Sequence, residues 1–197
     1  MMRIVHADDR LVVIDKPAGL LSVPGRTESD CASARVQAAY PDALIVHRLD
    51  QATSGLLLFA RGPDAQRELS ADFAGRRVGK TYVAVVAGHL EGEGLIDLPL
   101  GADWPNRPRQ QVDLEQGKPS QTSWRVLAHE GGHTRVALEP LTGRSHQLRV
   151  HLAHLGHAIL GDALYAEPDI AATSPRLLLH ASELHIGGHH FVCPPEF

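Results

Sequence analysis

The chain has 197 residues, and 19 Lys and Arg against 23 Asp and Glu give it a formal net charge of −4 at pH 7. Hydrophobic residues make up 43% of it and charged residues 21%, which excludes an intrinsically disordered protein. No apolar run approaches the roughly 20 residues that cross a bilayer, the N-terminus lacks the apolar core of a signal peptide, and two cysteines are too few for a disulfide framework. We therefore expect one soluble, cytoplasmic domain over residues 1–197, with a monomer as the default.

The first part of the chain alternates short apolar runs with turn-forming residues, a pattern typical of buried strands and short helices. The polar stretch HRLDQATSG separates two of the apolar runs and places Asp50 on a loop between buried elements. We expect strands at 11–14, 44–46 and 56–60, and helices at 30–40 and 63–74.

The second part of the chain is dominated by strands. Residues 99–122 are rich in proline and glycine and predict a long loop, whereas Gly187-Gly188 is a hairpin signal. A helix is expected over 145–155, with Ser145 as its N-cap and Gly156 at its end. Further strands are expected at 81–87, 124–128, 136–138, 177–186 and 190–193. The whole pattern predicts an α+β protein with a mixed, largely antiparallel sheet.

Asp50 is the first candidate for chemistry. Arg48 precedes it by two residues, so the two side chains point the same way if this piece is extended. A neighbouring cation favours the ionised carboxylate, which can act as a nucleophile or a base. The alternative is a surface ion pair without a catalytic role.

Two further segments combine arginines with features that suit RNA. GRSHQLR places Arg144 and Arg149 at a loop-to-helix junction, where free N–H groups favour an anion. DWPNRPR carries Arg107 and Arg109 beside an aromatic ring, a combination that can stack bases and contact phosphates. Either segment is alternatively a solvated basic turn.

A second basic cluster, Arg76 and Arg77, precedes the strand that carries Tyr82. A tyrosine in the middle of a strand is more often part of the core than of a site. The net negative charge requires any nucleic-acid contact to use local patches such as this cluster, since the chain as a whole repels phosphate.

Histidines are dense over residues 146–157, where His151 and His154 lie three apart on the expected helix. That spacing allows a shared metal ion, although the segment lacks the His-Glu-x-x-His arrangement of zinc hydrolases. Solvated or hydrogen-bonded histidines are the alternative, and we expect no metal.

Taken together, these motifs resemble the RluA-type pseudouridine synthase family. VHRLDQATSGLLLFAR is similar to its catalytic motif, KTYVAVVAG to its tyrosine strand, and LTGRSHQLRVHLAHLGHAILGDALY to its arginine motif, in the family's order. LVVIDKPAGLLSVPG and PRLLLHASEL are similar too, and DWPNRPRQ with GKPSQT resembles the short dual-specificity members. Ala158 departs from the family, which usually has proline there.

The resemblance implies a pseudouridine synthase fold with a central cleft, no N-terminal S4 domain, and no cofactor. It implies that Asp50 is the nucleophile, that Arg149 forms an ion pair with it, that Tyr82 packs against the target base, and that Arg48 helps to flip that base. The implied partners are stem-loops of 23S ribosomal RNA and the anticodon loop of some tRNAs. Whether Asp50 attacks C1′, attacks C6 or promotes a glycal path stays open. The alternatives are a non-catalytic RNA-binding module and a histidine-based metal hydrolase.

Overall fold

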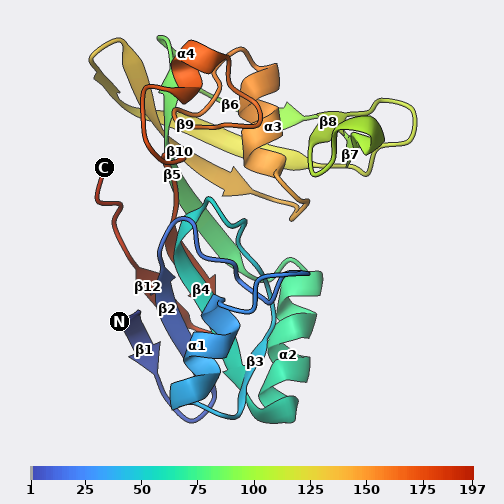
Figure 1. The fold of residues 1–197 in the computed structure, drawn as a ribbon, viewed down its shortest axis with the longest axis vertical. Coiled ribbons are helices and arrows are strands. Elements are labelled where there is room, and N and C mark those ends of the chain that lie inside the picture. The colour runs from blue at the N-terminus through green and yellow to red at the C-terminus, as the bar shows by residue number, and fades with distance from the viewer. Residues whose placement is uncertain (1) are drawn as a thin grey trace. The chain divides into compact units, whose positions relative to one another are not determined.

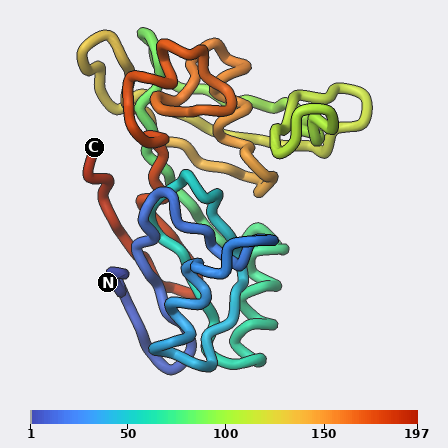
Figure 2. The backbone as a smooth tube through the Cα atoms, in the orientation of Figure 1, coloured from blue at the N-terminus to red at the C-terminus, as the bar shows by residue number. Residues whose placement is uncertain are grey.

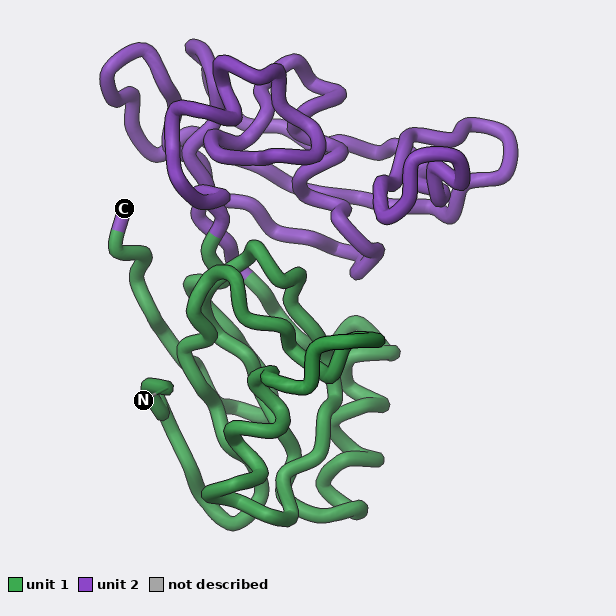
Figure 3. Tube along the Cα trace, in the orientation of Figure 1, with its two compact units in different colours: residues 1–80, 180–196 green, residues 81–179, 197 purple. Residues whose placement is uncertain are grey.

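The computed structural model describes residues 2–197, which form two compact units (Figure 3). Among the described residues, unit 1 comprises 2–80 with His180–Glu196, and unit 2 comprises Thr81–Leu179 with Phe197. Figure 2 shows both ends of the colour range, blue and red, in unit 1. Unit 1 is therefore built from both ends of the chain, and the expectation of a single domain stays a prediction.

Unit 1 is a sheet with two helices against it (Figure 1). Strand β4 (Ser54–Arg61) is central: β2 pairs with it antiparallel along its length, β3 pairs antiparallel with its C-terminal end, and β11 pairs with it in parallel at Ser54 and Gly55. β1 pairs with β2 and β12 with β11, both antiparallel. The other strands are β1 (Arg3–Ala7), β2 (Leu11–Lys16), β3 (Ala43–Ile45), β11 (Leu179–Ile186) and β12 (His189–Val192).

Both helices of unit 1 lie near their predicted positions. Helix α1 (Ala32–Ala39) ends before Pro41, because the residue before a proline disfavours helical geometry. Helix α2 (Gly62–Ala74) has Pro63 in its first turn and Gly75 at its C-cap, and it buries Ala65 and Leu69. These two side chains join apolar residues of β2, β4, β11 and β12 in one core.

Unit 2 holds an antiparallel sheet in the order β5-β10-β9-β6 and a separate two-stranded sheet, β7-β8. Helix α3 (Gln147–His154) packs against β8, β9 and β10. The remaining elements are β5 (Gly79–Ala87), β6 (Glu93–Asp97), β7 (Leu100–Ala102), η1 (Trp104–Asn106), β8 (Gln110–Val112), β9 (Gln121–Glu130), β10 (His133–Pro140) and α4 (Pro168–Ala171).

The α+β prediction is confirmed, because short helices accompany a sheet with many antiparallel pairs and a parallel pairing of β4 with β11. The predicted hairpin is also present: Gly187 and Gly188 have φ of 54° and 83° between β11 and β12. Such a turn needs positive φ at both positions, which glycine adopts without strain. No helix in residues 2–197 has the length and hydropathy to span a membrane.

Two expectations for unit 2 are wrong in detail. The predicted loop over 99–122 contains β7, η1 and β8, which are three residues each and too short to produce a periodic pattern. Strand β6 was not predicted. Helix α3 begins at Gln147 with His146, not Ser145, at its N-cap.

Candidate active site

Asp50 lies half-buried in the loop between β3 and β4, as the sequence predicts, and Arg48 is exposed in the same loop. The loop turns immediately after the aspartate, because the Thr53 N–H donates to the Asp50 carbonyl at 3.1 Å. Asp50 thus stands on irregular backbone directly before the central strand of unit 1.

Lys16 fixes the backbone beside Asp50. Its side chain is fully buried at the end of β2, and its ammonium donates to the carbonyls of Pro17 at 2.9 Å, Leu20 at 2.7 Å and Gln51 at 3.2 Å. A buried charge is costly unless polar groups surround it, so these carbonyls and the ammonium hold each other in place. The sequence reasoning missed Lys16, although a lysine shortly after the apolar run Leu11–Ile14 is an available signal.

Ser22 holds the residue on the other side of Asp50. Its hydroxyl donates to the Leu49 carbonyl at 2.7 Å and accepts the Leu49 N–H at 3.0 Å. Both backbone groups of Leu49 are therefore bonded to one buried side chain. The peptide on each side of Asp50 is anchored to the segment that follows β2.

His47 anchors the start of the same loop to the sheet and to α2. Its Nε2 accepts the Leu58 N–H at 2.9 Å, and its ring stacks on Phe73 with centroids 4.4 Å apart. A ring nitrogen that accepts a hydrogen bond carries no proton. Burial, together with the positive charge of Lys80, lowers the pKa of His47 to about 3, so the ring is neutral at pH 7.

Gly55 allows β4 and β11 to approach closely just after the loop. Its φ is +109°, and a Cβ at this position would lie 2.3 Å from the Ala181 carbonyl oxygen. Only glycine fits such a contact. The glycine of the DQATSG motif therefore has a steric role in holding the strand that supports Asp50.

Arg149 is buried in α3 and forms a bidentate ion pair with Asp162. Its Nε lies 2.9 Å from Oδ2 and its Nη2 lies 2.7 Å from Oδ1, and the two side chains are 5% and 1% exposed. Asp162 Oδ1 also accepts the N–H groups of Leu164 and Tyr165. The sequence reasoning did not assign Asp162, although it lies inside the GHAILGDALY segment. The two parallel hydrogen bonds hold the Arg149 guanidinium in one orientation.

Tyr165 connects Arg149 to the segment that carries Arg107 and Arg109. The guanidinium carbons of Arg149 and Arg109 lie 5.1 and 5.5 Å from the centre of its ring. Its hydroxyl accepts the Gln110 N–H at 2.8 Å and bonds His146 Nδ1 at 2.5 Å. Tyr165 therefore fixes the start of β8 relative to the N-terminus of α3.

Gln147 explains why α3 starts where it does. Its Oε1 accepts the Thr142 hydroxyl at 2.7 Å and the Arg144 N–H at 3.1 Å, while its Nε2 donates to the Gln121 carbonyl and to Thr122. This buried amide closes the turn before the helix, a task that the sequence analysis gave to Ser145. His146 then takes a left-handed φ of 55°.

The two units each hold part of the predicted site. Asp50, Arg48, Arg76 and Arg77 belong to unit 1, whereas the other predicted residues belong to unit 2. The meeting of Asp50 with Arg149 and Tyr82 therefore stays a prediction. The unit 2 residues are Tyr82, Arg107, Arg109, Arg144 and Arg149.

Tyr82 is half-buried in β5, opposite Leu138 of β10. Among the exposed arginines, Arg77 pairs with Asp72 at 2.8 Å and Arg144 donates to the Pro119 carbonyl at 3.4 Å. Arg76 follows α2 with a φ of 57°. Exposure leaves these cations accessible to an anionic partner, and their ion pairs at the surface are weak.

For the histidine-rich segment 146–157, the structure favours hydrogen-bonded histidines over a shared metal ion. His151 is fully buried, its Nδ1 accepts the Thr122 hydroxyl at 2.9 Å, and its Nε2 donates to the Leu98 carbonyl at 3.0 Å. Both ring nitrogens are therefore engaged, and burial lowers the pKa of the ring. This arrangement disfavours a metal ion shared between His151 and His154.

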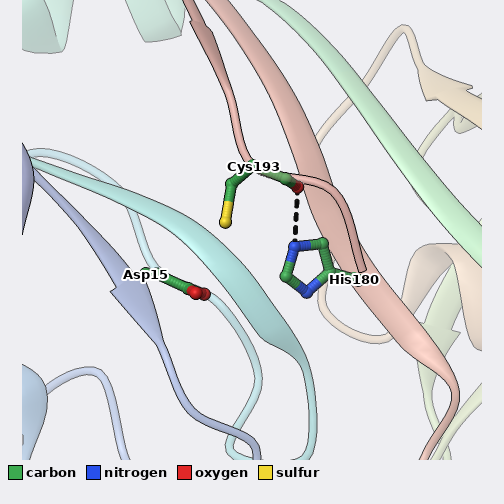
Figure 4. A group of neighbouring side chains, drawn as sticks. All are labelled: Asp15, His180 and Cys193. Atoms are coloured by element: carbon green, nitrogen blue, oxygen red, sulfur yellow. Dashed lines mark hydrogen bonds between the residues drawn. The ribbon is translucent and has the colours of Figure 1, made fainter. Parts of the chain in front are cut away.

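A buried cluster in unit 1, Asp15, His180 and Cys193, has metal-ligand residue types within reach of one ion (Figure 4). His180 Nε2 donates to the Cys193 carbonyl at 2.9 Å and its Nδ1 accepts the Ser54 hydroxyl at 2.8 Å. Burial and the Asp15 carboxylate raise the pKa of the Cys193 thiol to about 11. Both ring nitrogens of His180 are engaged in hydrogen bonds, an arrangement that disfavours a metal ion held by these three side chains.

Comparison with known proteins assigns the family. Residues 10–154 match the model of the RNA pseudouridylate synthase family. The chain is 54% identical over 187 residues to the dual-specificity RNA pseudouridine synthase RluA of Escherichia coli strain K12, covering 93% of this chain and 85% of that protein. It is 50% identical over 200 residues to the protein of the same name in Yersinia pestis, covering 100% of this chain and 97% of that one.

Solved structures agree with this assignment. Human RNA Pseudouridylate Synthase Domain Containing 1 superposes with a TM-score of 0.85 at 31% identity, covering 100% of this chain and 84% of that one. Human RNA Pseudouridylate Synthase Domain Containing 4 gives 0.78 at 26% identity, covering 98% and 89%. The resemblance seen in the sequence is therefore confirmed, and the chain belongs to the RNA pseudouridylate synthase family.

Proposed function

We propose that this protein isomerises specific uridines to pseudouridine in stem-loops of ribosomal RNA and tRNA, with Asp50 as the nucleophile. The observation that carries the proposal is an aspartate in a family-typical motif, on a loop anchored at both neighbouring peptides by Lys16 and Ser22. Its substrates follow from relatives named dual-specificity RNA pseudouridine synthases.

The reaction is balanced without a cofactor. The N1–C1′ bond of the uridine breaks, the base turns, a C5–C1′ bond forms, and the proton of C5 is lost while N1 gains one. No electrons or groups are exchanged with a second reactant. The enzyme must supply an ionised carboxylate in a preorganised site, and Asp50 can attack C1′, attack C6 or promote a glycal path.

Arg149 is proposed to provide positive charge for this carboxylate, and Tyr82 to present its ring to the base. The Asp162 pair and the Tyr165 ring support the role of Arg149, because they hold its guanidinium in one orientation. The target base must leave its stack, which costs least in an RNA loop. Arg48, exposed on the Asp50 loop, is proposed to help expel it.

The RNA is proposed to meet exposed arginines of both units in the cytoplasm, with the protein acting as a monomer. A small stem-loop offers few phosphates, which reconciles RNA binding with a net charge of −4. The proposed contacts are Arg76, Arg77, Arg107, Arg109 and Arg144.

Asp50→Asn tests the proposal because it keeps the shape of the side chain and removes the nucleophile. We expect pseudouridine formation in a stem-loop substrate, read by chemical mapping, to fall below detection while the Kd for that RNA changes less than about threefold. Asp64→Asn, an exposed carboxylate in α2, is the matched control and should keep full activity. Activity of Asp50→Asn close to that of the wild type contradicts the assignment. Tight binding without turnover by the wild type would instead favour the RNA-binding module.

A further inference from the structure

The segment between β7 and β8 carries an exposed aromatic ring that the proposed chemistry does not use. Trp104 is 68% exposed, and the guanidinium carbon of Arg107 lies 3.5 Å from the centre of its ring. Single exposed apolar side chains are common in folded proteins, so it is the exposed aromatic ring together with the cation against one of its faces that points to a partner. The ring therefore has one side against a cation and substantial accessible surface elsewhere.

The backbone around Trp104 is well ordered by hydrogen bonds. The Asp103 N–H donates to the Arg109 carbonyl at 3.0 Å, and the Arg109 N–H donates to the Asn106 carbonyl at 3.0 Å. The Asp103 carboxylate accepts the side-chain amide of Asn106 at 3.0 Å. These hydrogen bonds close the η1 turn. A ligand that binds at Trp104 therefore needs to order little of this backbone.

The end of this turn is tied to the helix that carries Arg149. Gln110, the first residue of β8, donates its N–H to the hydroxyl of Tyr165, whose ring lies near the guanidinium of Arg149. A ligand at Trp104 is therefore connected through a few contacts within unit 2 to a proposed catalytic group. That connection favours a role for Trp104 in holding the substrate.

We propose that Trp104 stacks an unpaired base of the RNA stem-loop, with Arg107 covering the opposite face of the ring. This rests on the proposed function, which supplies the RNA, and it adds a base-binding site. An aromatic ring beside arginines is the chemistry that binds unpaired bases, because bases stack on the ring and guanidinium groups meet the phosphates.

Two carboxylates near Trp104 in the sequence, Asp103 in this segment and Asp113 after β8, are each engaged by amide groups. The Asp103 carboxylate accepts a hydrogen bond from the side-chain amide of Asn106. The Asp113 carboxylate accepts hydrogen bonds from the backbone N–H groups of Glu115 and Gln116 at 3.1 and 2.9 Å. Both carboxylates thus bond neighbouring amides. An RNA base fits this surface better than a second copy of the chain, because the guanidinium of Arg107 lies against the ring.

The test uses Trp104 as a fluorescent reporter. The chain has two tryptophans, so Trp124→Phe leaves Trp104 alone and Trp104→Ala leaves Trp124 alone. Titration of Trp124→Phe with a substrate stem-loop should quench its emission strongly, whereas Trp104→Ala should show little change. A fully paired duplex of the same length should quench weakly, because it offers no unpaired base.

Affinity gives the second readout. Trp104→Ala should raise the Kd for the stem-loop about five- to hundredfold, and Trp104→Phe should recover most of that loss because a phenyl ring still stacks. Leu114→Ala removes an exposed apolar side chain just after β8 and should leave the Kd unchanged.

Unchanged affinity of Trp104→Ala, equal quenching by the duplex, or a Trp104-dependent dimer in sedimentation would each overturn this site. A third outcome separates the two proposals. If the wild-type protein forms no pseudouridine, while the stem-loop still quenches Trp104 and Trp104→Ala still binds it more weakly, the proposed activity is wrong and the base-binding site stands.

Discussion

At the scale of single residues, the candidate site depends on buried polar groups whose partners are backbone atoms or one opposite charge. Lys16 binds carbonyls around the Asp50 loop, and Arg149 binds Asp162. A buried polar group without a partner costs free energy. Each of these residues therefore holds its surroundings in one arrangement, which is the property that a catalytic site needs.

Arg149→Met should destabilise the protein because it leaves the Asp162 carboxylate, 1% exposed, without its guanidinium. Breaking a buried pair costs about 3–5 kcal/mol, which urea unfolding can measure. Arg144→Met, at an exposed position of the same turn, is the control and should change stability by less than about 0.5 kcal/mol. An Arg149→Met protein as stable as the wild type would show that the pair contributes nothing.

His47 should make stability depend on pH below neutrality. Its pKa is about 3 in the folded protein against an ordinary 6.5, so between these values the unfolded chain binds a proton that the folded protein excludes. The neutral His47 ring makes its full contribution to the free energy of unfolding above pH 6.5. Below that value the free energy of unfolding should fall by up to about 1.4 kcal/mol for each unit by which the pH decreases. His47→Asn should flatten this slope between pH 6.5 and 5, and equal slopes in both proteins would contradict the assignment.

At the scale of elements, one segment in each unit positions a proposed catalytic residue. The parallel contact of β4 with β11 places Gly55 against Ala181 directly after the Asp50 loop. In unit 2, the buried side-chain amide of Gln147 closes the turn before α3. It thereby sets the position of Arg149, which lies in the first turn of that helix. The loops are thus positioned by rigid strands and helices.

Gly55→Ala should therefore cost more than backbone strain alone. The new Cβ would lie 2.3 Å from the Ala181 oxygen, so the two strands must separate. Gly62→Ala is the matched control: its φ is also positive, at +79°, but nothing lies within 4 Å. We expect a loss of about 1–2 kcal/mol for Gly62→Ala, from left-handed strain, and a clearly larger loss for Gly55→Ala in thermal or urea unfolding. Equal losses would remove the steric role of Gly55.

At the scale of the whole molecule, the net charge of −4 constrains how RNA can bind. Long-range attraction to phosphate is weak for an acidic protein, so affinity must come from local arginines, stacking and loop shape. Specificity for a few stem-loops follows more readily from such a surface than from a broad basic face.

Salt dependence measures this directly. Arg144→Gln should reduce the slope of log K against log[salt] by about 0.7–0.9 for one lost phosphate contact, so its affinity should differ most from the wild type at low salt. Arg10→Gln is the control, because Arg10 is exposed and already paired with Glu68. Equal slopes in Arg144→Gln and the wild type would remove Arg144 from the RNA contacts.

The family, the α+β class and the main elements could all be predicted from the amino-acid sequence. Hydrophobic runs, Pro63 and Gly75 at the ends of α2, and the Gly187-Gly188 hairpin are local signals, and local backbone preferences decide them. The catalytic candidate Asp50 was also available from its motif, because its loop lies between two apolar runs.

Which distant groups pair could be read from the folded protein alone. Asp162 is thirteen residues from Arg149, and the Gln51 carbonyl is thirty-five residues from Lys16. Neither pairing leaves a periodic or spacing signal, because burial selects partners in space rather than along the chain. The short strands β7 and β8 and the exposure of Trp104 were likewise decided by packing, which no local propensity encodes.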